Sequence, residues 1–233
     1  RKEGNRVVGV DTTRGPIDCD KLGIVVAGHS GVMAERAGFR LPIESVALQA
    51  LVSEPIEPCM DVVVMANTVH GYLSQSDKGG LVFGGDLDMY ASYASRGNLP
   101  MVEHVMEAGM TLMPMIGKAR VLRSWGGIMD MSPDGSPIIG PAWGKCNLWL
   151  NEGHSFGVTA AGGAGWQLAE WIVEGESSID MLGVDPRRFG PYASRGYLKT
   201  KNEEAYRNVF TPHYPDEERW DARPLKQTPC NDR

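Results

Sequence analysis

Three glycines crowded into the start of one predicted helix constrain this chain more than any other feature. The segment NEGHSFGVTAAGGAGWQLAEWIVEG, residues 151–175, has the apolar periodicity of a helix over residues 160–174. Gly162, Gly163 and Gly165 fall inside its first turns. Each glycine inside a helix costs roughly 0.5–1 kcal/mol relative to alanine, so three together need a compensating contact. We expect another surface to lie very close to this helix.

Two kinds of contact would explain the missing side chains. The free amide groups at a helix N-terminus attract negative charge, so the helix could lie against the anionic edge of a flat ring such as a reduced flavin. The glycines could equally allow tight packing against a helix or a sheet, without any ligand. The phosphate-binding spacing Gly-x-Gly-x-x-Gly occurs nowhere in the chain. The glycine pattern alone therefore leaves both interpretations open.

Bulk composition argues against several classes of protein. The 233 residues are 42% hydrophobic, enough for a real core, and the net charge of -6 does not favour binding to nucleic acid. No run approaches the roughly 20 apolar residues of a membrane helix, and the first residues lack a signal-peptide pattern. The four cysteines are far apart, and the histidines have no ligand-like spacing. We expect no metal and no membrane, with a location in the cytoplasm, or in the mitochondrial matrix of a eukaryote.

Apolar runs and turn signals alternate along the chain in a way that predicts a mixed α/β fold. The region around 46–85 is typical of a mainly antiparallel meander, whereas the apolar run 22–27 is typical of a strand covered on both faces. Ser30 is expected to cap the helix that follows, and Gly38 to end it. The expected strands are 6–13, 15–18, 22–27, 46–52, 62–66, 81–85 and 148–150, and the expected helices are 31–38, 101–116, 160–174 and 200–210.

Two further segments combine with the glycine-rich helix to form a specific resemblance. They are VAGHSGVMAERAGFRLP at 26–42 and SWGGIMDMSPDGSPIIG at 124–140. In this order the three segments resemble the glycine/sarcosine oxidase family of flavoproteins, within the D-amino-acid oxidase superfamily, and the first is especially similar to sarcosine oxidase beta subunits. The tail, with DPRRFG at 185–190, resembles the connecting region of dimethylglycine and sarcosine dehydrogenases.

This resemblance implies a domain organisation. The chain would be the C-terminal half of a two-domain FAD-dependent amine oxidoreductase, α/β overall and inactive by itself. It would join the last elements of the FAD-binding domain to an antiparallel-sheet substrate domain, and both of its ends would be cuts through a longer protein. The implied parts are the end of the FAD-binding domain (1–41), the substrate domain (42–122), a return to the FAD-binding domain (123–180) and a connecting region toward a further C-terminal domain (181–233).

The resemblance also implies an activity. FAD would take a hydride equivalent at its N5 atom from an N-methyl amine, such as dimethylglycine or sarcosine. The resulting imine would yield formaldehyde or a one-carbon unit on tetrahydrofolate, which a further C-terminal part would bind. Oxygen or an electron-transfer flavoprotein would accept the electrons. The alternatives are a sarcosine oxidase beta-like subunit or another amino-acid oxidase, and a non-catalytic scaffold that kept the fold.

Residues are assigned to the cofactor by their positions in the matching segments. Ala27 and Gly28 would lie near the adenine-ribose side of FAD, whereas Gly126, Gly127 and the loop 153–159 would line its isoalloxazine ring. Trp125 stands where one monomeric branch of the family has a cysteine bonded to flavin, and tryptophan cannot form that bond. The implied cofactor-contacting residues are Ala27, Gly28, Trp125, Gly126, Gly127, Gly153, His154, Ser155, Phe156, Gly157, Val158 and Thr159.

Two residues are candidates for catalysis. Tyr72 matches a tyrosine that family members place over the substrate, although a strand tyrosine can also be a packing residue. His154 could bond flavin or substrate, or have only a structural role in its loop. Asp134 is expected to bond the backbone amides of its own turn. Where monomeric sarcosine oxidases hold the substrate carboxylate with a lysine, this chain has Val158 or Thr159, which carry no charge.

Overall fold

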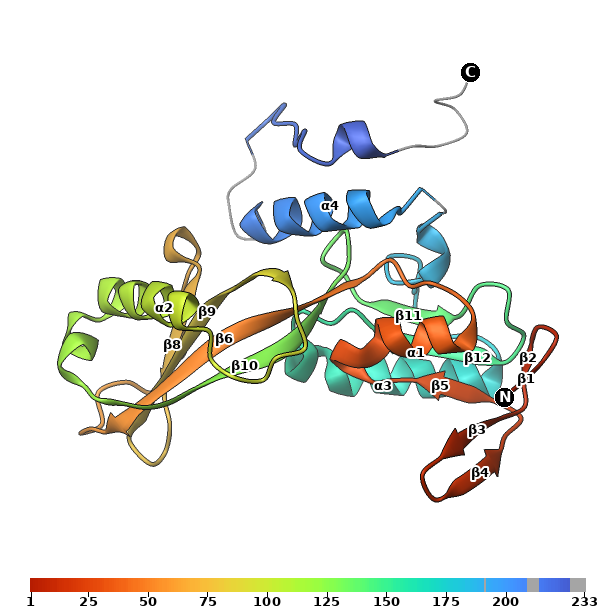
Figure 1. Ribbon diagram of the computed structural model, residues 1–233, viewed down its shortest axis with the longest axis horizontal. Coiled ribbons are helices and arrows are strands. Elements are labelled where there is room, and N and C mark those ends of the chain that lie inside the picture. Colours follow the sequence, from red (N-terminus) through yellow and green to blue (C-terminus); the bar gives the residue numbers. More distant parts are fainter. Residues whose placement is uncertain (191, 209–213, 227–233) are drawn as a thin grey trace. The chain divides into compact units, whose positions relative to one another are not determined.

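The computed structural model describes residues 1–190, 192–208 and 214–226. The chain divides into two compact units, each described by itself below (Figure 1). Unit 1 consists of Arg1–Glu44, Asp130–Val209 and Pro215–Arg233, and unit 2 consists of Ser45–Met129 and Phe210–Tyr214.

The central sheet of unit 1 has three strands in the order β11-β12-β5. β12 (Leu148–Glu152) pairs parallel with β5 (Leu22–Ile24) and antiparallel with β11 (Ile138–Pro141). The three strands are therefore adjacent in space although more than a hundred residues separate β5 from the other two. This pairing brings the segments that follow β5 and β12 to the same edge of the sheet.

Helices cover both faces of this sheet. Successive side chains of β12 point to opposite faces, and each face packs against a different helix. Leu148 and Leu150 belong to the core cluster that contains Ala34 of α1 (Ser30–Ala37). Trp149 points the opposite way, into the cluster built around Leu168 of α3 (Gly157–Glu174). Unit 1 is thus a three-layer arrangement of helix, sheet and helix, and Figure 1 shows α1 and α3 beside the strands.

Short elements complete unit 1. Two antiparallel hairpins open the chain, and α4 packs with the segment around Ala222 through Tyr197 and Leu198. None of the helices in the described part of the chain has both the length and the hydrophobicity that crossing a membrane requires. The remaining elements of the unit are β1 (Lys2–Glu3), β2 (Arg6–Val7), β3 (Gly9–Thr12), β4 (Gly15–Asp18), α4 (Arg195–Asn208) and the 3-10 helices η1 (Ala27–His29), η4 (Pro186–Arg188) and η5 (Arg223–Leu225).

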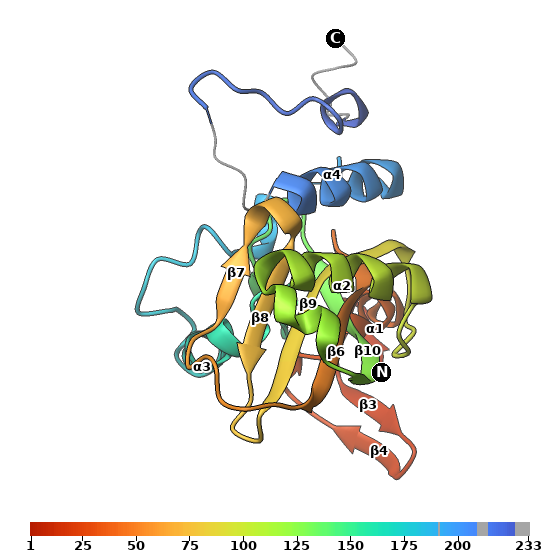
Figure 2. The same cartoon turned by 90° about the vertical axis from the view of Figure 1, so that its left-hand side faces the viewer.

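Unit 2 is built on a five-stranded sheet in the order β10-β6-β9-β8-β7. The pairs β6–β9, β9–β8 and β8–β7 are antiparallel, and Figure 2 shows α2 lying across these strands. Leu51, Phe83 and Val105 are buried between the sheet and the helix. The elements are β6 (Glu44–Pro55), β7 (Val64–Ala66), η2 (Asn67–Val69), β8 (Gly71–Gln75), β9 (Gly80–Ala91), α2 (Leu99–Leu112), η3 (Pro114–Lys118) and β10 (Val121–Met131).

The mixed α/β fold with an antiparallel sheet is confirmed, but several local predictions need correction. Ser30 does not cap α1, because the cap position is His29 and Ser30 is the first helical residue. The strand that begins at Leu22 ends at Ile24, and Val25, which follows it, is exposed, so the apolar run 22–27 is not a strand covered on both faces by the described residues. Helix α3 begins at Gly157 rather than at residue 160. Gly38 ends α1 with φ +83°, as predicted.

Candidate functional site

The carboxyl ends of β5 and β12 form the edge of unit 1 where a ligand would be expected, since ligands of open α/β sheets bind outside the carboxyl ends of parallel strands. Soon after β5 comes η1, which contains Ala27 and the buried Gly28. After β12 comes the loop that begins at Gly153 and runs into α3. Two of the segments assigned to the cofactor from sequence therefore meet at this edge.

A buried hydrogen-bond network joins these two segments. The Oγ atom of Ser30 lies within hydrogen-bond distance of Oε2 of Glu152, at the end of β12. The same Oγ atom contacts the carbonyl oxygen of Ala27, whose backbone has a left-handed φ of +46°. Ser30 and Glu152 are both fully buried, at 0% exposure. The network fixes the turn after β5 against the end of β12.

Burial dominates the electrostatics of Glu152. It raises the pKa of the carboxyl group from 4.5 to about 8, against the hydrogen bonds with Ser30 and the Val26 amide, which lower the pKa. The charge of Asp130, which stands near the end of β10 and belongs to unit 1, raises the pKa further. Oε1 of Glu152 has no hydrogen-bond partner among the described residues. Burial and the charge of Asp130 both favour the neutral carboxylic acid over the carboxylate at this position.

His154 lies in the loop between β12 and α3 and is held by its neighbour. Its Nε2 atom lies 2.6 Å from Oδ1 of Asn151. Because an amide oxygen only accepts, Nε2 carries the ring proton and Nδ1 has a lone pair. Nδ1 is buried and has no partner in the described part of the chain, and burial lowers the pKa of His154. The ring is thus a neutral imidazole with one acceptor atom to offer.

Helix α3 has one buried and one uncovered face. Ala164 and Leu168 pack against the sheet, whereas Val158 is 98% exposed and Trp166 is 72% exposed. The glycines at 162, 163 and 165 have open space beside them, because a Cβ atom added at any of them would meet no atom within 4 Å. The first amides of the helix have no partner within the helix. This face of α3 is therefore uncovered by the described residues and has room for another surface to approach its backbone.

Asp134 stabilises the turn in the Pro-Asp-Gly segment, as predicted. Its Oδ1 atom accepts from the Ser136 amide at 3.0 Å and from the Ser132 hydroxyl at 3.1 Å. The Arg188 guanidinium binds the carboxylate with Nε at 2.8 Å from Oδ2. Burial favours a higher pKa for Asp134, but these hydrogen bonds and the charge of Arg188 lower it overall. Asp134 is an anchor for the loop before β11.

Tyr72 lies on β8 in unit 2, where its half-buried side chain lies over the backbone of the neighbouring strand β9. It pairs with Gly84 on β9. A Cβ atom added at Gly84 would lie 2.6 Å from the Tyr72 hydroxyl oxygen and 2.7 Å from the Gln49 carbonyl oxygen. Burial raises the pKa of Tyr72, so the hydroxyl keeps its proton at neutral pH. Gly84 is therefore the residue that leaves room for the tyrosine.

Trp125, Gly126 and Gly127 lie on β10, at the opposite end of the same sheet. β6 and β9 stand between β10 and β8, so three strand spacings, on the order of 14 Å, separate this segment from Tyr72. Gly126 is buried, and a Cβ there would lie 3.0 Å from the Ala94 carbonyl oxygen. Gly126 thus has a packing role within unit 2. The structure does not bring these glycines and Tyr72 together.

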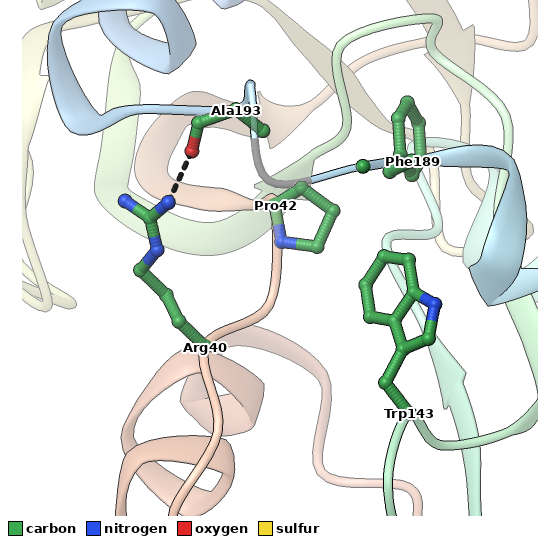
Figure 3. A pocket seen from close by; sticks show the side chains of 6 residues that line it. Arg40, Pro42, Trp143, Phe189 and Ala193 are labelled. Atoms are coloured by element: carbon green, nitrogen blue, oxygen red, sulfur yellow. Dashed lines mark hydrogen bonds between the residues drawn. The ribbon is translucent and has the colours of Figure 1, made fainter. Parts of the chain in front are cut away.

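The cavities described in each unit do not coincide with the predicted residues. In unit 1, a cavity of about 310 Å³ is lined by the rings of Pro42, Trp143 and Phe189, and Arg40 donates to the Ala193 carbonyl at its side (Figure 3). In unit 2, a cavity of about 250 Å³ is lined by residues that include His70, Asp86, His104 and Glu107. Within the described ranges, no three His, Cys, Asp or Glu side chains are grouped to hold a metal ion.

Comparison with known proteins decides the family. A sequence profile described as FAD dependent oxidoreductase matches residues 1–171, most of the chain. The chain belongs to this family of FAD-dependent oxidoreductases. A second profile, described as FAD dependent oxidoreductase central domain, matches residues 174–228.

Curated relatives agree with the resemblance inferred from the sequence. Sarcosine oxidase subunit beta of Rhizobium meliloti is 55% identical over 199 residues, which cover 85% of this chain and 47% of that protein. The subunit from Rhodobacter capsulatus is 54% identical over 182 residues, covering 77% and 43%. Mitochondrial dimethylglycine dehydrogenase of Rattus norvegicus is 27% identical over 240 residues, covering 94% and 28%. The chain thus spans less than half the length of these relatives.

Solved structures confirm the fold. L-proline dehydrogenase from P. horikoshii superposes with a TM-score of 0.75 at 25% identity, over 80% of this chain and 51% of that one. Glycine oxidase from Geobacillus kaustophilus gives a TM-score of 0.71 at 21% identity, over 78% of this chain and 49% of that one.

The FAD of this family fits the chemistry present in unit 1. The open face of α3 could accept a flat ring where side chains would exclude it, and His154 Nδ1 is a buried polar atom that lacks a partner among the described residues. Sequence reasoning missed Glu152 and gave Ser30 a different role. One signal was available, because a glutamate that ends the apolar run LWLNE is unusual for a buried strand.

Proposed function

We propose that the intact protein containing this chain oxidises a small N-methyl amino acid of the sarcosine type, with FAD as its cofactor. The observation that carries this proposal is the identity of 55% over 199 residues with a protein named sarcosine oxidase subunit beta. The uncovered glycine face of α3 and the adjacent loop support FAD binding by unit 1. Bound FAD would take two electrons and a proton from the methyl carbon, and hydrolysis of the resulting imine would give formaldehyde.

Dimethylglycine is the second candidate substrate. Its support is the match of rat dimethylglycine dehydrogenase to 94% of the chain, together with the central-domain match at 174–228. If dimethylglycine is the substrate, a further part of the protein would bind tetrahydrofolate, which would receive the one-carbon unit. An electron-transfer flavoprotein or oxygen would reoxidise the flavin.

Purification of the intact protein tests the activity. We expect a yellow protein whose flavin absorbance is bleached anaerobically by sarcosine or dimethylglycine, with formaldehyde as product. Comparing the reduction rates of the two substrates identifies the preferred one, and formaldehyde yield with and without tetrahydrofolate tests the folate step. Admitting oxygen or an electron-transfer flavoprotein to the reduced enzyme identifies the acceptor. A colourless protein that takes up no FAD, or a flavin that neither amine reduces, would overturn the proposal.

Tyr72 and His154 are proposed as the catalytic residues. The proposed role of Tyr72 is a hydrogen bond from its hydroxyl to the substrate, and that of His154 is acceptance of one at Nδ1. Tyr72→Phe keeps the ring over Gly84 and removes only the hydroxyl, so it should slow flavin reduction at least tenfold, whereas Tyr93→Phe, at an exposed tyrosine of unit 2, should not. A reduction rate within about twofold of the wild type, or about 0.4 kcal/mol, would remove Tyr72 from catalysis.

A further inference from the structure

The hydrogen-bond network around Ser30 contains one proton too few if Glu152 is ionised. Ser30 Oγ carries a single proton and faces two oxygen atoms, the Ala27 carbonyl oxygen and Glu152 Oε2. A carbonyl oxygen only accepts hydrogen bonds, so the contact with Ala27 needs the Ser30 hydroxyl as donor. The contact between Ser30 Oγ and Glu152 Oε2 then has no proton, unless Glu152 supplies one. Both contacts are satisfied together only when Glu152 is a carboxylic acid that donates to Ser30.

The surroundings of Glu152 also disfavour a charge. The side chain is fully buried, and Oε1 lacks a hydrogen-bond partner within the part of the chain that the structure covers. The charged group that acts on it is another acid of unit 1, Asp130, and its other neighbours are the Ser30 hydroxyl and the Val26 amide. An ionised carboxylate here would be desolvated beside a like charge, which is costly unless a cation compensates.

We propose that Glu152 is a proton-bearing positioning residue, which holds the Ala27–His29 turn through Ser30 and so couples the two segments of unit 1 assigned to FAD. The flavin part of this inference rests on the proposed function. The turn needs such an anchor, because Ala27 has the left-handed φ of +46° that residues other than glycine rarely adopt. Without the link, the end of β12 and the turn after β5 would lose their buried side-chain connection.

The stability of the apoprotein should reveal the proton. The pKa of Glu152 is about 8 in the folded protein and near its ordinary 4.5 when unfolded. Between these values the folded state holds a proton that the unfolded state has lost. The contribution of Glu152 to the folding equilibrium constant therefore falls by up to about tenfold per pH unit as pH rises from about 4.5 to about 8, and levels off above that.

The experiment uses the intact protein as wild type, Glu152→Gln, Glu152→Ala and Ser30→Ala, with Glu174→Gln at an exposed position of α3 as the control. Glutamine is neutral at every pH and can donate to Ser30. Glu152→Gln should remove the part of the pH dependence that Glu152 contributes, up to about tenfold in the folding constant per pH unit, and with it the infrared band of the protonated Glu152 carboxyl group. Glu174→Gln should keep both. An unchanged slope in Glu152→Gln would show that Glu152 is ionised in the folded protein, and would overturn the inference.

FAD affinity tests the coupling. At pH 7, Glu152→Gln should bind FAD within about threefold of the wild type, whereas Glu152→Ala and Ser30→Ala should bind at least tenfold more weakly. Above pH 8.5, the wild type should lose affinity and Glu152→Gln should not. Wild-type affinity in Ser30→Ala would overturn the positioning role even if the proton is present. A protein that never binds FAD would contradict the proposed function, but the pH slope of the apoprotein would still decide whether Glu152 is protonated.

Discussion

Alanine substitution of the three glycines in α3 separates the two explanations for their presence. None of Gly162, Gly163 and Gly165 has a positive φ, so alanine can adopt the same backbone conformation. An added Cβ meets no atom within 4 Å at any of them. In a protein without bound flavin, the triple variant should therefore gain only helix propensity. At about 0.5–1 kcal/mol per residue, the expected stabilisation is about 1.5–3 kcal/mol.

Bound flavin should reverse this advantage. If the ring lies against the glycine face, three methyl groups occupy the space it needs, and FAD affinity should fall at least tenfold, or about 1.4 kcal/mol. The assay pairs chemical denaturation of the apoprotein with a titration of FAD, both on the intact protein. Gly196→Ala, in the first turn of α4, is a matched control, because a Cβ there also meets open space. It should leave FAD affinity unchanged.

Two outcomes would refute the reasoning. A more stable apoprotein with FAD affinity within twofold of the wild type would show that the ring does not approach these glycines. A destabilised apoprotein would show that another part of the polypeptide already covers this face, which is the packing interpretation that the sequence left open.

Three further substitutions test the local structure. Gly84→Ala should destabilise the intact protein by about 1–3 kcal/mol in urea denaturation, because the new methyl group would overlap the Tyr72 ring, and an unchanged midpoint would contradict this packing. Asn147→Ala should lower the free energy of unfolding by about 2–4 kcal/mol in the same assay, because the buried amide makes three hydrogen bonds to backbone groups, worth about 0.5–1.5 kcal/mol each. A loss below about 0.5 kcal/mol would mean that water replaces these bonds. Asp134→Asn should lower the free energy of unfolding by no more than about 1 kcal/mol at neutral pH, because the carboxylate is partly exposed. The difference from the wild type should vanish in acid, where protonation of the wild-type carboxylate breaks its pairing with Arg188. A difference that persists in acid would exclude the ion pair as its cause.

Local features of the fold were predictable from the sequence because short-range backbone preferences encode them. Gly38 ends α1 in the left-handed conformation that glycine adopts without strain, and Asp134 bonds the amides of its own turn. The start of α3 was less predictable. Its first turn, from Gly157, contains no strong helix signal and no side-chain cap, and the residues that pack against the sheet, Ala164 and Leu168, come later in the helix.

The sequence by itself determined the family, the mixed α/β class and the glycine-rich helix, because each depends on short motifs whose own residues are close together in the chain. Only the tertiary structure revealed the partnership of Ser30 and Glu152, which stand 122 positions apart. It depends on the parallel pairing of β5 with β12, which brings the two strand ends together and removes both side chains from water. Burial then favours the neutral acid over the carboxylate, because water no longer solvates the charge and the nearby charge of Asp130 has the same sign.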